Sequence, residues 1–329
     1  MKAIFSLMPV LLFLIGLFLF DSFKLVNKKY LILCMIWGAI AAWIAFYLNN
    51  WLVNQLALEF SLFSKYLAPL TEELLKSILL LYLIARRRIG FSIDAAIYGF
   101  SAGTGFALAE NIAYLNTLNY DTANVVWMIR GFGTAVMHGG ATALFAMIMI
   151  GGIQRDKPFI LSIIPALILS YVVHSGFNHF LLNPYLQVTL IITLLPVLFY
   201  IIFKHSTNVL QQWLEIEFSN EVEMLSMIRR GEFADTKAGN YLVELKKHFL
   251  PEMILDLYCY LSLYLELSIK AKRNLMLKEN GFPIIREVDT MDKLIELRLL
   301  RKAIGKLGEL ALQPLVRMKH LELWKLNQL

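Results

Sequence analysis

The sequence predicts an all-α, polytopic membrane protein with about seven transmembrane helices and a C-terminal helical cytosolic domain. Of the 329 residues, 58% are hydrophobic, and the mean hydropathy of +0.60 is far above that of an ordinary soluble protein. The apolar residues are grouped in stretches of about 20, the length needed to cross a bilayer. The charge is also uneven: 12 Lys and Arg and 8 Asp and Glu precede Lys204, whereas 19 and 17 follow from there on.

The apolar stretches define the expected spans in order. They lie near residues 4–20, 30–48, 66–85, 91–116, 125–150, 158–182 and 185–203. No small-x-small cleavage site follows the first stretch before Asp21, so we expect a retained span rather than a signal peptide. Segment 49–64 is too short and too polar to cross. We expect it along the outer surface, with Trp51, Phe60 and Phe63 at the interface.

The basic residues between the spans predict the orientation. They follow the first, third, fifth and seventh spans, and are Lys24, Lys28, Lys29, Arg86, Arg87, Arg88, Arg155, Lys157 and Lys204. All of these loops lie on one side of a seven-span protein. The positive-inside rule therefore places the N-terminus outside and the C-terminus in the cytoplasm.

These patterns divide the chain into three parts. Residues 1–65 hold two spans and the outer segment, 66–204 form a membrane-embedded core, and 205–329 form the cytosolic domain. The last part reads as charged amphipathic helices with breaks at Arg230-Gly231, Asn280-Gly281 and Gly305. It has no cysteine–histidine pair, glycine-rich phosphate loop or strongly basic face, so we expect no nucleic-acid partner; a cytosolic protein is the partner that such helices suit. With only Cys34 and Cys259, a disulfide framework is not expected.

Ionisable residues inside spans usually face the bundle interior and mark a functional site. They are Glu72, Glu73, Lys76, Asp94, Glu110, Arg130, His138, His174 and His179. Asp94 and Arg130 lie near span ends, where an interfacial role is expected. Spacing of i and i+4 places Glu72 with Lys76, Phe106 with Glu110, and His174 with Asn178 on shared helix faces.

Adjacent helical residues point about 100° apart. We therefore expect only one of Glu72 and Glu73 to face the site, while the other pairs with Lys76. The remaining polar residues are expected around one cavity in the outer half of the bilayer. A buried salt-bridge network that only fixes helix packing is the alternative interpretation. Glycines such as Gly99, Gly103 and Gly139 on the fourth and fifth spans permit either close helix packing or room for a substrate segment.

Four motifs in order, E-E-L-L-K at 72–76, F-A-L-A-E-N-I-A-Y at 106–114, G-F-G-T-A-V-M-H-G-G-A-T around His138 and H-S-G-F-N at 174–178, resemble those of PrsW-type intramembrane proteases. More distantly, they resemble the CAAX prenyl endopeptidases of the same ABI superfamily. The resemblance covers roughly residues 66–182 and implies a protein of a bacterial or archaeal cell membrane. Its candidate catalytic set is Glu72, Glu73, Glu110, His138, His174 and Asn178.

In that resemblance Glu72 activates a water molecule. Glu110 stands where the prenyl endopeptidases commonly have a histidine that helps hold the water, and His174 and Asn178 stabilise the oxyanion. His179 and the helical region after 205 depart from the family pattern. The roles suit the chemistry, because hydrolysis without a covalent intermediate needs a base for the water and donors where negative charge develops.

The predicted function is therefore an intramembrane endopeptidase acting on a membrane-anchored protein within the lipid bilayer. A divalent metal such as zinc, held by Glu72, Glu110, His138 and His174, is one version of the mechanism. The absence of an H-E-x-x-H motif favours the version without a cofactor. A transporter or proton relay is an alternative, although no matching pair of broken helices is visible. A non-enzymatic receptor or scaffold acting through the cytosolic helices is another.

Overall fold

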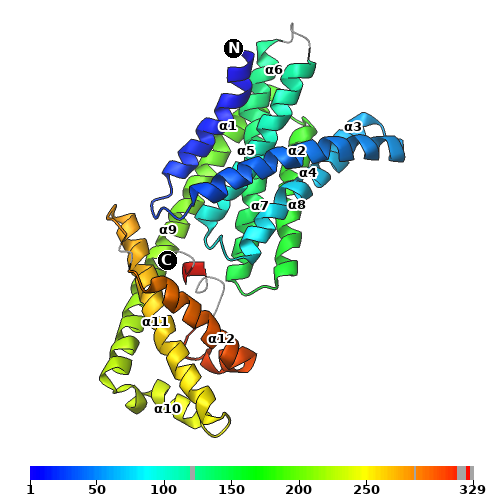
Figure 1. Ribbon diagram of the computed structural model, residues 1–329. Helices are drawn as coiled ribbons and strands as arrows, with labels where there is room; N and C mark the ends of the chain where they lie inside the picture. The colour runs from blue at the N-terminus through cyan, green and yellow to red at the C-terminus, as the bar shows by residue number, and fades with distance from the viewer. Residues whose placement is uncertain (119–122, 285–286, 317–323, 327–329) are drawn as a thin grey trace. The chain divides into compact units, whose positions relative to one another are not determined.

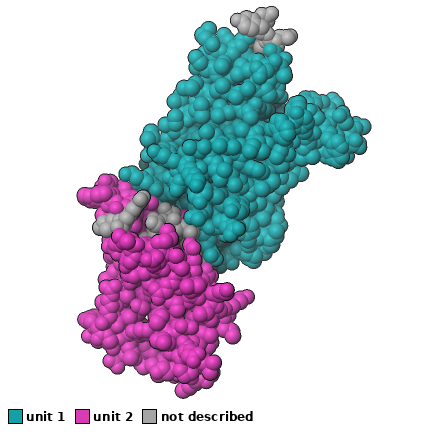
Figure 2. Space-filling model, in the orientation of Figure 1, with its two compact units in different colours: residues 1–207 teal, residues 208–329 magenta. Residues whose placement is uncertain are grey.

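The computed structural model describes residues 1–118, 123–284, 287–316 and 324–326, and within these ranges the regular structure is entirely helical (Figure 1). The residues divide into two compact units, 1–207 and 208–329 (Figure 2). The elements of unit 1 are α1 (Lys2–Leu19), α2 (Lys28–Leu56), α3 (Phe60–Leu62), η1 (Phe63–Leu67), α4 (Ala68–Ala85), α5 (Ser92–Thr117), α6 (Asn124–Met128), η2 (Ile129–Ala135), α7 (Val136–Gln154) and α8 (Phe159–Asn178). The long helix α9 (Pro184–Arg230) begins in unit 1 and ends in unit 2. Unit 2 continues with η3 (Phe233–Asp235), α10 (Lys237–Leu245), α11 (Pro251–Glu279) and α12 (Thr290–Leu312).

Within the described residues, five helical segments are long and apolar enough to cross a membrane. They are α1, α2, the continuous α6–η2–α7 segment, α8 and α9, and they coincide with five of the predicted spans. The other two predicted spans are the helices α4 and α5. Three charged residues within its 18 positions lower the apolar character of α4, and α5 is rich in small and polar residues. The count of seven spans stays a prediction.

Helix α5 is the central helix of unit 1 and is buried without interruption from Ile93 to Ala107. It packs against α2 and α7 (Figure 1). Small residues make this approach possible: a Cβ added to Gly103 would lie 2.3 Å from the backbone oxygen of His138, and one added to Gly99 would lie 2.6 Å from that of Thr142. The small residues of α5 therefore serve close helix packing.

Segment 49–64 differs from the prediction. Helix α2 continues to Leu56 and ends where Ala57 adopts a left-handed conformation (φ 49°), so the first half of the expected surface segment is the last two turns of a long helix. Trp51 and Phe60 are exposed, but Phe63 is only 2% exposed, and its predicted interfacial position is wrong. Phe63 begins the π-helical turn η1, which packs against α4 and α8. The polar side chains of this segment have protein partners: the Ser64 hydroxyl donates to the Ser61 carbonyl, and Asn49 bonds to residues of α4.

Unit 2 has its own apolar core, to which α11 and α12 contribute most of the buried residues, among them Leu257, Leu261 and Leu297. The three predicted breaks are confirmed. Helix α9 ends before Gly231 (φ 77°) and α11 ends before Gly281 (φ 75°), left-handed conformations that glycine adopts without a Cβ clash. Gly305 interrupts α12 with non-helical angles.

Candidate active site

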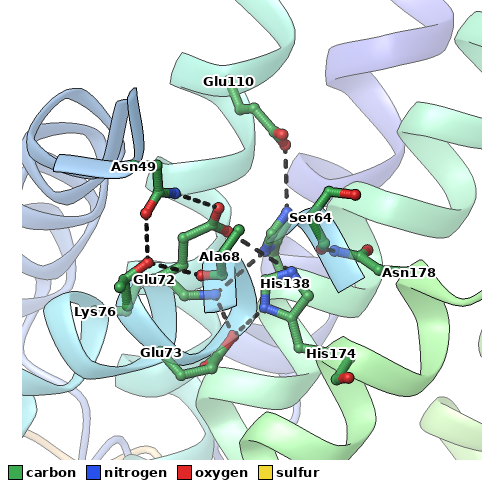
Figure 3. Close-up of polar contacts among 12 residues, drawn as sticks. Asn49, Ser64, Ala68, Glu72, Glu73, Lys76, Glu110, His138, His174 and Asn178 are labelled. Atoms are coloured by element: carbon green, nitrogen blue, oxygen red, sulfur yellow. Dashed lines mark hydrogen bonds and ion pairs between the residues drawn. The ribbon is translucent and has the colours of Figure 1, made fainter. Parts of the chain in front are cut away.

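Four helices of unit 1 bring six polar side chains together (Figure 3). Helix α4 supplies Glu72, Glu73 and Lys76, α5 supplies Glu110, α7 supplies His138 and α8 supplies His174. All six were selected from the sequence, although they lie up to about a hundred residues apart.

Glu73 is the most buried carboxylate of the group, with 1% of its side chain exposed. Its Oε1 atom accepts a hydrogen bond from Lys76 Nζ at 2.5 Å and lies 2.8 Å from His174 Nδ1. Lys76 is fully buried; its Nζ also lies 3.2 Å from His138 Nδ1 and 4.8 Å from the centre of the Phe106 ring. The ammonium group and the carboxylate therefore compensate each other's burial cost.

Glu72 has a different environment, with 14% of its side chain exposed. Its Oε1 accepts a hydrogen bond from Asn49 Nδ2 at 3.3 Å, and its Oε2 lies 3.7 Å from His174 Nε2. The Asn49 oxygen accepts from the Thr71 hydroxyl at 2.6 Å, which directs the amide nitrogen toward Glu72 (Figure 3). Sequence reasoning missed Asn49 because it was assigned to the surface segment. Its signal was an amide at the end of a long apolar stretch.

The expectation that only one of the two glutamates faces the site is wrong in this structure. Glu73 approaches His174 at Nδ1 and Glu72 approaches the same ring at Nε2. An imidazole presents its two nitrogens on different edges, so two side chains that point about 100° apart can both reach it. The pairing of Lys76 with the remaining glutamate is present, and its partner is Glu73.

His138 lies beside a second carboxylate. Its Nε2 is 3.3 Å from Glu110 Oε2, and Arg130 Nη2 is 3.2 Å from the same oxygen. The arginine side chain is only 15% exposed. The expected interfacial role of Arg130 is therefore wrong, because the π-helical segment η2 brings it to Glu110.

Asp94 stands apart from this group and has a structural role. It is fully buried at the start of α5, where its carboxylate accepts hydrogen bonds from the backbone nitrogens of Gly90 and Phe91 at 2.9 and 2.8 Å. Such acceptors satisfy the unpaired N–H groups at a helix start.

Asn178 and His179 are directed to other partners. The Asn178 amide donates to the Ser64 carbonyl at 3.0 Å, and His179 Nδ1 lies 2.6 Å from the carbonyl of Ser175. The His179 ring also packs edge-on against Tyr66, with 4.8 Å between the ring centres. Asn178 thus ties α8 to η1, and in this structure its amide nitrogen is not directed at the two histidines.

Glu72, His138 and His174 each offer one ligand atom, and these atoms lie within 4.8 Å of one another. Two imidazoles and one carboxylate form the donor set of catalytic zinc sites that keep a position open for water. Glu73 beside His174 also resembles the carboxylate support that metal-bound histidines usually receive. The residues present therefore fit a divalent metal. Glu110, also expected as a ligand, is outside this group of three among the described residues.

Carboxylates and two imidazoles gathered between apolar helices are the kind of polar cluster that marks a functional site in a membrane protein. The family model of the PrsW family intramembrane metalloproteases matches residues 27–203, more than half of the chain. The chain belongs to this family: it is a peptidase and an integral membrane protein. Comparisons with curated proteins and with solved structures gave no match.

Proposed function

We propose that the protein is an intramembrane endopeptidase that hydrolyses a peptide bond of a membrane-anchored protein in the extracytoplasmic half of the bilayer. The observation that carries the proposal is the position of Glu72: a carboxylate with one oxygen held by Asn49 and the other directed at His174. Among the carboxylates of the site, Glu72 is the one without a lysine or arginine partner in the described contacts. It is therefore the one best placed to take a proton.

In this mechanism Glu72 removes a proton from the attacking water and returns it to the leaving amine. His174 is held at Nδ1 by Glu73, which leaves its Nε2 edge toward Glu72 and the reacting water. His138, between Lys76 and Glu110, meets the His174 ring edge-on, with 4.6 Å between the two ring centres. An N–H group of either imidazole or the Lys76 ammonium would stabilise the charge that develops on the carbonyl oxygen.

The family is described as metalloproteases, and Glu72, His138 and His174 are the residues that would hold the metal. A bound zinc ion would supply Lewis-acid activation of water and of the scissile carbonyl. The wider relationship to the CAAX prenyl endopeptidases is part of the same proposal.

The orientation follows from the loop charges and places the N-terminus outside and unit 2 in the cytoplasm. The substrate is a membrane-anchored protein whose cut segment enters the site from the bilayer, and unit 2 would contact a cytosolic protein. A bacterial or archaeal cell membrane is the expected location.

The test is cleavage of single-span membrane proteins by the purified protein in liposomes, with mapping of the cut bond by mass spectrometry. Glu72→Gln should remove cleavage. Glu59→Gln is the matched control, because Glu59 is an exposed carboxylate that directly precedes α3 and lies outside the site. Cleavage by Glu72→Gln at the wild-type rate would end the proposal.

A chelator arm tests the metal. Loss of activity with 1,10-phenanthroline that zinc restores, together with bound metal in the purified protein, would establish the metal-dependent version. Full activity of protein that contains no metal would establish Glu72 as an unaided base.

A further inference from the structure

Arg130 is a polar residue of unit 1 whose contacts with the site the sequence did not anticipate. It lies on η2, a seven-residue π-helical stretch between α6 and α7. Such stretches are rare and occur frequently at functional sites. Arg130 lies outside the four motifs that indicated the site, but its guanidinium group contacts a residue of that site.

The contacts hold the guanidinium group on three sides. Its Nη2 lies 3.2 Å from Glu110 Oε2, its Nε donates to the Asn111 side-chain oxygen at 2.9 Å, and its central carbon lies 3.6 Å from the centre of the Tyr114 ring. An arginine with a carboxylate, an amide and an aromatic face around it has little freedom to move.

The Glu110 oxygen that meets Arg130 is also the oxygen that lies 3.3 Å from His138 Nε2. The result is a chain of cation, carboxylate and imidazole. Lys76, Glu73 and His174 form a second chain of the same kind. Each histidine of the site thus has its own carboxylate, and each of these carboxylates has its own cation.

Helix α1 supports the Arg130 chain from outside the family-matched segment, which begins at residue 27. The Asn111 amide donates to the backbone oxygen of Ser6 at 2.8 Å, and a Cβ added to Gly131 would lie 1.8 Å from the backbone oxygen of Phe5. The absence of a side chain at Gly131 therefore lets α1 contact η2 directly next to Arg130.

We propose that Arg130 is a positioning residue, supported by α1 through Asn111, that acts through Glu110 to hold the ring of His138. Without the guanidinium group, the Glu110 carboxylate loses its opposing charge and turns away from His138. The effect on cleavage rests on the proposed function, whereas the effect on His138 does not.

The first measurement is free of substrate. The ring-nitrogen signals of ¹⁵N-histidine-labelled protein are recorded in detergent, and that of His138 is assigned by its loss in His138→Gln. Arg130→Gln should move the His138 signal in the same direction as Glu110→Gln does. Arg86→Gln is the matched control, because Arg86 also lies over a tyrosine ring, that of Tyr82, but is about 20 Å along α4 from Glu72. An unchanged His138 signal in Arg130→Gln would overturn the proposal.

The second measurement is a double-mutant cycle on cleavage. Arg130→Gln and Glu110→Gln should each lower kcat about 10- to 100-fold with little change in KM, and the double variant should be no slower than the slower single variant. A double variant whose loss equals the product of the two single losses would show that Arg130 acts elsewhere. If the wild-type protein cleaves nothing, the proposed function fails and the His138 signal still decides the role of Arg130.

If Arg130→Gln does not fold, Asn111→Ala replaces it. That variant removes the Asn111 amide that links Arg130 to α1, while Arg130 and Glu110 themselves are unchanged. The His138 signal should shift in the same direction as in Glu110→Gln, and a folded Asn111→Ala protein with the wild-type signal would refute the proposal.

Discussion

Replacing each of the two adjacent glutamates by glutamine should separate chemistry from stability. Glu73 is 1% exposed and lies against the fully buried Lys76 ammonium and the His174 ring. Removing one partner of a buried ion pair costs about 3–5 kcal/mol, because the other charge stays buried without compensation. In Glu73→Gln, the Lys76 ammonium loses the carboxylate that pairs with it and keeps its contacts with His138 and the Phe106 ring. The unfolding equilibrium constant should therefore rise by about two to four orders of magnitude.

Glu72→Gln should cost far less stability. The Glu72 side chain is partly exposed, its close contacts are Asn49 and His174, and no lysine or arginine pairs with it among the described ion pairs. Its replacement removes about one hydrogen bond, worth about 1 kcal/mol. Cleavage should nevertheless disappear, because a glutamine side chain cannot take a proton from water.

The two cysteines provide the stability assay. Cys34 on α2 is completely buried, whereas Cys259 in unit 2 is exposed. In a Cys259→Ser background, labelling by a thiol-reactive fluorophore during heating reports the unfolding of unit 1 alone. The Glu73→Gln midpoint should lie well below that of the wild type, and the Glu72→Gln midpoint should lie close to it. Equal loss of stability in the two variants, or a wild-type midpoint for Glu73→Gln, would refute the reasoning.

Three further outcomes are expected. Asn49→Ala should lower kcat about 10- to 100-fold, because it removes the hydrogen bond that holds Glu72 Oε1. Asn50→Ala, at the exposed neighbouring residue, should leave kcat unchanged, and equal cleavage rates for the two variants would contradict this prediction. Truncation after residue 207 should leave cleavage intact, since the site lies in unit 1; a folded truncated protein without cleavage would make unit 2 part of the catalytic unit. Hydrogen bonds from Lys270 and Arg273 hold the pKa of Glu287 below its ordinary value of 4.5. The ionised Glu287 therefore stabilises unit 2 at neutral pH, and this contribution to the free energy of unfolding is lost as the pH falls below about 4.5. The protection of the α11 and α12 amides against hydrogen exchange should therefore be modestly lower at about pH 4 than at neutral pH, after correction for the intrinsic exchange rate. Equal protection at the two pH values would contradict this prediction.

Local patterns in the sequence determined much of this protein. Apolar stretches predicted the helices of unit 1, because a helix that crosses the apolar interior of a bilayer needs about 20 consecutive apolar residues. The glycines at 231 and 281 marked helix ends for a backbone reason that acts within a few residues. The charged residues inside apolar helices indicated the site, because charges are costly to bury in a membrane and are usually found there only at functional sites.

The sequence could also show that one glutamate of the pair meets Lys76, because i, i+3 and i, i+4 neighbours share a helix face. It could not show that both glutamates meet His174. That contact joins residues about a hundred positions apart, and it depends on which edge of the imidazole ring each helix presents.

Only the tertiary structure decided the outer contacts of the site. It extended α2 so that Asn49 reaches Glu72, directed Asn178 to Ser64, and brought Arg130 to Glu110 through a π-helical turn. A π-turn shifts the following side chains around the helix axis, and no residue pattern announces it. The distances between α2, α5 and α7 are set by glycines that let backbones touch, so the site is fixed by helix packing rather than by the motifs that first indicated it.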